Sequence, residues 1–228
     1  DEDVVTELFV TSTHTPVLFF STHGKVYRLK VWRLPEGAPQ TRGRPMINLL
    51  PLAPGETIST VLPLPEDEAE WGALNVVFAT ARGNVRRNSM DAFANVPSNG
   101  KFAMRFDDDS DDRLIGVALL TEDDDVLLAT RGGKAIRFSA TDVREFQSRT
   151  STGVRGITLK GDDEVISLSI LNGFDTTTDE REAYLRAAAW KENDNDATLS
   201  AERMAEFAAA EQFILTVCAN GYGKRSSA

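Results

Sequence analysis

A motif that recurs along the chain constrains the fold more than any other feature of this 228-residue sequence. The motif is an apolar run, a short polar segment, a glycine, and an arginine four residues after that glycine. Its four copies read VLFFSTHGKVYR (17–28), VVFATARGNVRR (76–87), VLLATRGGKAIR (126–137) and ILTVCANGYGKR (214–225). The glycines Gly24, Gly83, Gly133 and Gly221 are 59, 50 and 88 residues apart. Each copy predicts a β-hairpin in which the glycine occupies a turn position that tolerates positive φ.

A second element alternates with the first and gives the same period. Its three copies read TRGRPMINLLPL (41–52), SNGKFAMRF (98–106) and STGVRGITL (151–159), and their glycines are 57 and 53 residues apart. An apolar stretch that predicts a strand follows each copy, at residues 57–64, 114–120 and 165–171. Units of about 50 residues with about four short strands predict an all-β, propeller-like array, with a solenoid or a pair of sandwiches as the alternative.

The longest spacing between glycines indicates an insertion. It exceeds one period by about 38 residues, which matches a shift to Ala-, Glu- and Arg-rich sequence at residues 175–210. Thr177 with Glu180 predicts a capping box, Ser200 predicts a helix N-cap, and residues 193–196 predict the turn between two helices. We therefore expect an acidic helical hairpin inserted in the array. A tolerated surface insertion and a module that docks a partner both remain open.

The distribution of charge matters more than the net charge of −10. Residues 174–212 contain ten acidic and four basic residues, whereas the rest of the chain contains 25 acidic and 21 basic residues. Acidic residues form blocks at 107–112, 122–125 and 162–164, and basic residues recur near the repeat glycines. On a radial array they would form a curved positive band that suits the phosphates of bent DNA. The alternative is that these arginines provide solubility and ion pairs with the acidic turns.

The sequence offers little support for catalysis or metal binding. His14 and His23 lack the spacing of a zinc site, and residues 107–112 lack the glycine and closing glutamate of an EF-hand loop. Residues 218–225 fail the pattern of a phosphate-binding loop. Arg42-Gly43-Arg44-Pro45 is similar to the core of a minor-groove AT-hook, but an apolar run follows it at once, which favours a loop at the rim of the array. We therefore predict no catalytic residue, no metal and no cofactor.

Other features bear on cellular setting and packing. The chain lacks an apolar run of 18 residues, which predicts no membrane span, and the opening Asp1-Glu2-Asp3 is unlike a signal peptide. The single Cys218 cannot form an internal disulfide and is expected to be a small buried residue of a reducing, cytoplasmic protein. Trp32, Trp71 and Trp190 have no common spacing and are expected to pack in the interior.

Several strings resemble the C-terminal domain of the bacterial DNA gyrase A subunit. They are TRGRPMINLLPL, FATARGNVRR, LIGVALL, STGVRGITL and ANGYGKR, and the likeness covers residues 1–172 and 213–228. The corresponding part of the topoisomerase IV A subunit is the runner-up. The resemblance implies a β-pinwheel whose neighbouring blades exchange strands. Residues 1–228 would form part of such a disc, with residues 175–210 inserted in it.

The resemblance also implies a function. The domain would be non-catalytic and would wrap double-stranded DNA around a basic outer rim, in support of ATP-dependent negative supercoiling. The partners would be the remaining parts of the gyrase A and B subunits, in an A2B2 assembly in the bacterial cytoplasm and nucleoid, with ATP and magnesium used elsewhere in the enzyme. The DNA-binding residues implied are Arg28, Lys30, Arg42, Arg44, Arg86, Arg87, Lys101, Arg137, Arg149, Arg155, Lys224 and Arg225.

Two features limit what the resemblance implies. The family's nucleophilic tyrosine belongs to an upstream region, so Tyr27, Tyr184 and Tyr222 are not expected to attack DNA. The Q-R-R-G-G-K-G box of the family's first blade does not occur in this sequence. A propeller that binds another protein therefore stands as the alternative function.

Overall fold

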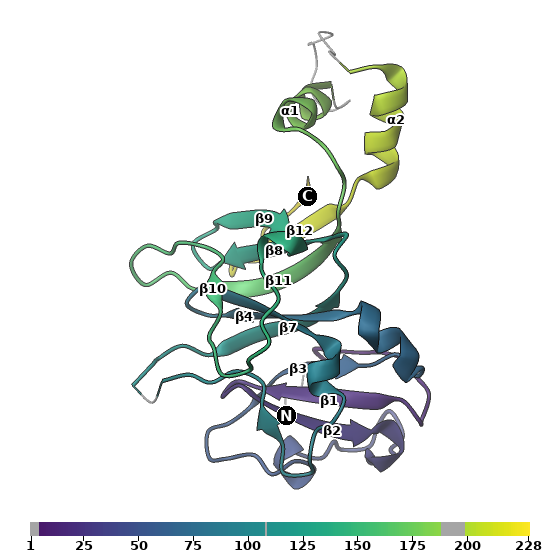
Figure 1. The fold of residues 1–228 in the computed structure, drawn as a ribbon, viewed down its shortest axis with the longest axis vertical. Coiled ribbons are helices and arrows are strands. Elements are labelled where there is room, and N and C mark those ends of the chain that lie inside the picture. The colour runs from purple at the N-terminus through teal and green to yellow at the C-terminus, as the bar shows by residue number, and fades with distance from the viewer. Residues whose placement is uncertain (1–4, 108, 188–198) are drawn as a thin grey trace. The chain divides into compact units, whose positions relative to one another are not determined.

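The computed structural model describes residues 5–107, 109–187 and 199–228 and divides the chain into two compact units, Asp1–Ile170 and Leu171–Ala228. The first unit contains three hairpins that follow one another along the chain (Figure 1). They are β1 (Pro16–Ser21) with β2 (Lys25–Lys30), β4 (Asn75–Thr80) with β5 (Asn84–Ser89), and β8 (Asp124–Thr130) with β9 (Ala135–Ser139).

The three hairpins share one register, which confirms the predicted repeat. The arginine four residues after each repeat glycine lies opposite the residue six positions before that glycine: Leu18 faces Arg28, Val77 faces Arg87, and Leu127 faces Arg137. Gly83 shows why a glycine is required at the turn. Its φ is +86°, and an added Cβ would lie 2.8 Å from the carbonyl oxygen of Ile157.

A third strand pairs with the first strand of each hairpin, where the sequence predicts one. These strands are β3 (Ile58–Pro63), β7 (Leu114–Leu120) and β11 (Val165–Asn172), which lie next to β1, β4 and β8. The apolar stretches that follow the second repeat element therefore form strands of the sheet built on the preceding hairpin.

The fourth strand of the first two sheets is contributed by the following repeat. The strand orders are β3-β1-β2-β6 and β10-β5-β4-β7, in which β6 (Lys101–Phe102) and β10 (Val154–Arg155) come from the next copy of the second element. The backbone approach is close: a Cβ on Gly153 would lie 2.1 Å from the carbonyl oxygen of Val85. The exchange of strands between neighbouring units, implied by the resemblance, is confirmed by this topology.

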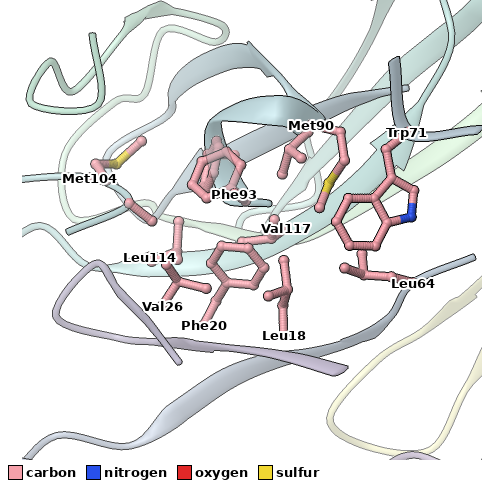
Figure 2. Packing of buried hydrophobic residues seen from close by; sticks show 13 residues of the cluster. Leu18, Phe20, Val26, Leu64, Trp71, Met90, Phe93, Met104, Leu114 and Val117 are labelled. Atoms are coloured by element: carbon pink, nitrogen blue, oxygen red, sulfur yellow. The ribbon is translucent and has the colours of Figure 1, made fainter. Parts of the chain in front are cut away.

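Apolar side chains fill the space between consecutive sheets (Figure 2). All six residues of β1 and of β4 are buried. Alternation along β4 directs Phe78 to a cluster with Phe20 and directs Val77 to a cluster with Val126. The rings of Phe20 and Phe78 meet edge to face with their centroids 5.6 Å apart. The sheet that contains β4 is therefore covered on both faces.

Short 3-10 turns join the strands of the first unit. They are η1 (Val31–Arg33), η2 (Met46–Asn48), η3 (Glu68–Ala73), η4 (Met90–Phe93) and η5 (Ala140–Asp142). Trp71 in η3 is only 2% exposed, as predicted, but Trp32 in η1 is 56% exposed, so the packing prediction is wrong there. Trp190 lies outside the described residues.

The second unit contains two helices and a fourth hairpin. The helices α1 (Thr178–Ala187) and α2 (Ala201–Ala210) lie within the segment predicted to be an insertion, and β12 (Phe213–Val217) pairs with β13 (Gly223–Ser227) in the register of the other hairpins. Thr177 and Glu180 form the predicted capping box through bonds of 2.9 and 3.2 Å, and Ser200 caps α2. The predicted turn at residues 193–196 lies outside the described residues. Cys218 is exposed, contrary to prediction, because it follows the exposed strand β12.

Candidate nucleic-acid interface

Half of the cations predicted to contact DNA are exposed. The exposed set is Lys30, Arg42, Arg44, Arg155, Lys224 and Arg225. Lys30 ends β2, and Arg155 lies on the edge strand β10. Arg42 and Arg44 lie in the loop between η1 and η2, and the last two residues belong to β13 of the second unit. Among the residues described, no ion pair engages any of the six. Their charges are therefore available to an anion in solution.

Arg86 is buried, which corrects the prediction that it contacts DNA. Its side chain is fully enclosed, and it donates hydrogen bonds to Asn88 Oδ1 at 2.7 Å and to the carbonyl oxygens of Arg149 at 3.0 Å, Ser151 at 2.5 Å and Ala103. Burial, followed by repulsion from Arg149, lowers the pKa of Arg86 to about 10. The equivalent residue of the first copy, Tyr27, is also buried, whereas Ile136 in the third copy is exposed, so the aromatic residue at position 27 is the one signal in the sequence for this burial.

Arg28 and Arg87 connect consecutive repeats instead of facing solvent. Arg28 donates to the carbonyl oxygen of Ala94, and Arg87 donates from Nε to that of Val143 at 2.8 Å. Both carbonyls immediately follow the 3-10 turn after the next hairpin, η4 in one case and η5 in the other. In both residues the guanidinium is already bonded to a backbone carbonyl of this chain. Arg87 is only 6% exposed, so it cannot serve as the predicted phosphate contact. Arg28 is half-buried and can contact a phosphate only in part.

Each of these two arginines also has a carboxylate near it. Arg28 Nη2 lies 3.1 Å from Glu68, and Arg87 Nη1 lies 3.6 Å from Glu122. Glu68 and Glu122 both precede the first strand of the next hairpin. The arginine therefore holds the beginning and the end of the following hairpin, so its presence in the first two copies has a structural explanation that the sequence pattern does not reveal.

Lys101 and Arg149 converge on one carbonyl oxygen. Lys101 Nζ donates to Ala92 at 2.7 Å and to Asn95 at 2.6 Å, and Arg149 Nη1 donates to Ala92 at 3.4 Å. Burial, with repulsion from Arg149, lowers the pKa of Lys101 to about 8. Both side chains are half-buried. Among the described residues no carboxylate forms an ion pair with either, so this pair keeps a positive charge that an anion could meet.

Arg137 differs from these because an acid opposes its charge. Its Nε and Nη2 atoms both lie 2.8 Å from Asp125 Oδ2, on the neighbouring strand of its own hairpin. The side chain is 24% exposed. The pairing reduces the charge that Arg137 can offer to a phosphate.

The acidic blocks have a structural role on the hairpin turns. Asp112 Oδ1 accepts from the backbone N–H of Arg82 at 2.9 Å, and Asp163 Oδ1 accepts from that of Gly132 at 2.7 Å, at the same position of two successive turns. Arg82 pairs with Asp111, while Arg113 and Arg131 pair with Glu164. Among the recurring cations weighed for DNA, Arg87 and Arg137 pair with Glu122 and Asp125 of a third block, so the alternative interpretation, ion pairs with acidic turns, holds for these two. No group of His, Cys, Asp or Glu suited to a metal occurs within the described ranges.

No helix of the described residues is both long and apolar enough to cross a bilayer.

Sequence reasoning missed the exposed pair Trp32 and Arg33, which lie side by side in η1 with the guanidinium carbon 5.0 Å from the indole centroid. Their position in the repeat could have indicated this exposure. They follow the repeat glycine by eight and nine residues, and the next two copies have Asp91-Ala92 and Thr141-Asp142 at the same positions.

Comparisons with known proteins agree with this architecture. A family described as the DNA gyrase C-terminal domain, beta-propeller, matches residues 15–65, 74–121 and 124–172. The DNA gyrase A subunit of Rickettsia bellii is 49% identical over the whole chain, and that of Granulibacter bethesdensis is 48% identical. The chain spans 26% of the length of each of these two relatives.

Solved structures show the same fold. The structure of a DNA gyrase A C-terminal domain has a TM-score of 0.61 at 20% identity, covering 94% of this chain and 55% of that one. A topoisomerase IV C-terminal domain has a TM-score of 0.61 at 22% identity over 71% of this chain and 48% of that one. The relatives at high identity decide between the two resemblances weighed from the sequence. The chain therefore belongs to the family of DNA gyrase C-terminal domains, and its fold is that family's β-propeller.

Proposed function

We propose that this chain is the DNA-wrapping part of a gyrase A subunit, which bends duplex DNA along its exposed cations. The observation that carries the proposal is the separation of charge. Lys30, Arg42, Arg44 and Arg155 are exposed and have no carboxylate partner in the part of the chain that the structure describes. Acids of two blocks, by contrast, cap turns or pair with other arginines. Cations that are free of internal partners bind phosphates through counterion release and read no sequence.

In this proposal the chain itself does no chemistry. It would hold DNA for the remaining parts of the A and B subunits, in an A2B2 enzyme of the bacterial cytoplasm and nucleoid that uses ATP and magnesium elsewhere to introduce negative supercoils. The segment at residues 175–210 would be an acidic insertion that keeps away from DNA, since ten acids and four bases occupy residues 174–212.

A salt titration tests the proposal. We expect the 228-residue chain to bind duplexes of unrelated sequence with similar affinity, and log K to fall linearly with log salt. Changing Arg42 and Arg44 to Gln should weaken every duplex alike and reduce the salt slope by about 0.9 for each phosphate that is no longer neutralised. The control changes Arg181 and Arg186, two exposed arginines of α1, to Gln, because this variant has the same net charge. Equal losses in both variants, or affinity that ignores salt, would refute the proposal.

A further inference from the structure

An exposed tryptophan at η1 is the least explained feature of the first unit. Trp32 is held through its backbone, whose N–H donates to the carbonyl oxygen of Thr13 at 2.9 Å, yet its side chain is 56% exposed. The backbone of Trp32 is therefore anchored, and its indole belongs to none of the three buried apolar clusters. Tryptophan is enriched at interfaces, because it combines a large apolar surface with a hydrogen-bond donor.

The repeat shows that an aromatic residue at this position is specific to the first copy. The position eight residues after the repeat glycine is Trp32, Asp91 and Thr141 in three successive copies, and all three are exposed. Two positions earlier, Ser89 and Ser139 cap their 3-10 turns, whereas Lys30 forms no side-chain cap. The first copy therefore replaces a polar, capped turn by a basic and aromatic one, at a position that faces solvent in these three copies.

The side chains around Trp32 line a hollow of about 350 Å³. The described residues that line it are Arg28, Leu29, Lys30, Trp32, Arg33 and Val96, which include three cations and no acid. The charge of Arg28 is opposed by Glu68, 3.1 Å away. Among the described residues neither Lys30 nor Arg33 has an ion pair, and Arg33 lies over the indole at 5.0 Å. The hollow thus combines a flat aromatic surface with two cations available to an anion.

A nucleotide has the complementary chemistry. Its base can stack on an indole, and its phosphates suit a lysine and an arginine on either side. In paired duplex DNA the faces of the bases are covered by their neighbours, so only a base that has left the stack, as at a kink or an unpaired position, can reach the indole. We propose that Trp32, Lys30 and Arg33 bind an unstacked nucleotide of DNA, a role that rests on the proposed DNA-binding function for the supply of phosphates.

The test compares two labelled duplexes of the same length, one fully paired and one with a single unpaired thymidine. We expect the 228-residue chain to bind the second at least about fivefold more tightly, because base–aromatic stacking gives that factor at its weak end. Trp32→Ala should abolish this preference and leave affinity for the paired duplex within about twofold. Trp32→Phe should retain part of it.

Fluorescence and a control variant complete the test. In a background that carries Trp190→Phe, the unpaired duplex should quench the tryptophan emission of the chain with Trp32 but not that of Trp32→Phe, since Trp71, the remaining tryptophan, is buried. Tyr222→Ala removes another exposed aromatic side chain and should keep the preference. An unchanged thermal midpoint of Trp32→Ala establishes that the variant is folded.

The outcomes separate the two proposals. Binding of the paired duplex with no preference for the unpaired one would overturn the nucleotide site alone. Failure to bind either duplex would overturn the proposed function as well. Quenching of Trp32 by a poly-glutamate peptide as strongly as by DNA would assign the hollow to an acidic protein segment and refute the nucleotide site.

Discussion

Replacing Arg86 by Met tests whether the arginines of β5 are structural. The change removes hydrogen bonds to Asn88 and to the carbonyl oxygens of Arg149, Ser151 and Ala103. A hydrogen bond from a charged donor contributes about 1.5–3 kcal/mol, so the gross loss is about 6–12 kcal/mol. Methionine restores most of the contact with Phe78, over whose ring the guanidinium lies at 4.7 Å.

Relief of burial offsets part of this loss. Burial lowers the pKa of Arg86 from its ordinary value to about 10, which corresponds to roughly 3 kcal/mol against the charged form in the folded protein. The carbonyls of Arg149 and Ser151 lie on either side of the exposed Thr150 in the chain, so in the variant water can donate to one or both of them in place of the guanidinium. We therefore expect a net loss of about 3 kcal/mol in the free energy of unfolding and a Tm about 6–12 °C lower.

Urea unfolding of the 228-residue chain, followed by circular dichroism, measures the change, and DNA titration below the transition measures the interface. The matched variant is Arg155→Gln, on the exposed edge strand β10. It should change stability by less than about 0.5 kcal/mol and reduce the salt slope of DNA binding by about 0.9. Arg86→Met should do the reverse. A stable Arg86→Met protein with a reduced salt slope would show that Arg86 reaches DNA and that its buried position is wrong.

Two further predictions concern the other cations of the first unit. Arg87→Met should lower the free energy of unfolding by about 2–3 kcal/mol, because the carbonyl of Val143 loses a charged donor at 2.8 Å. The affinity of the folded protein for DNA should stay unchanged. A loss of DNA affinity at constant stability would contradict this prediction. Burial and repulsion from Arg149 lower the pKa of Lys101 from its ordinary value of 10.5 to about 8 in the folded protein. Between pH 8 and pH 10.5 the unfolded chain therefore binds more protons than the folded one, so the free energy of unfolding should rise with pH in this interval. Urea unfolding at pH 8 and pH 10 should show the wild type gaining stability relative to Lys101→Gln, and parallel pH profiles would refute the assignment.

Much of the fold was predictable because hairpins are local. The repeat glycines and the arginine four residues later lie in one short stretch, so the turn, the register and the pairing of β1 with β2 follow from sequence spacing. The helix caps at Thr177 and Ser200 are local in the same sense. The period of about 50 residues identified the array, and the resemblance supplied the exchange of strands that places β6 and β10 on neighbouring sheets.

The candidate site was predictable only in part. A charge pattern treats every arginine as exposed, which holds for Arg42, Arg44 and Arg155 in a loop and on an edge strand. It fails for Arg86 and Arg87 because β5 lies between other strands in its sheet, and packing from neighbouring repeats covers both of its faces.

The sequence by itself determined the repeating unit, its hairpins and the family, since these depend on spacing within short segments. Only the tertiary structure decided which recurring cations face solvent, because exposure depends on what packs against a strand from repeats that are about 50 residues away. The same reason explains why Trp32 is exposed. Its position in the repeat is exposed in each of the three copies, so an apolar residue there remains on the surface.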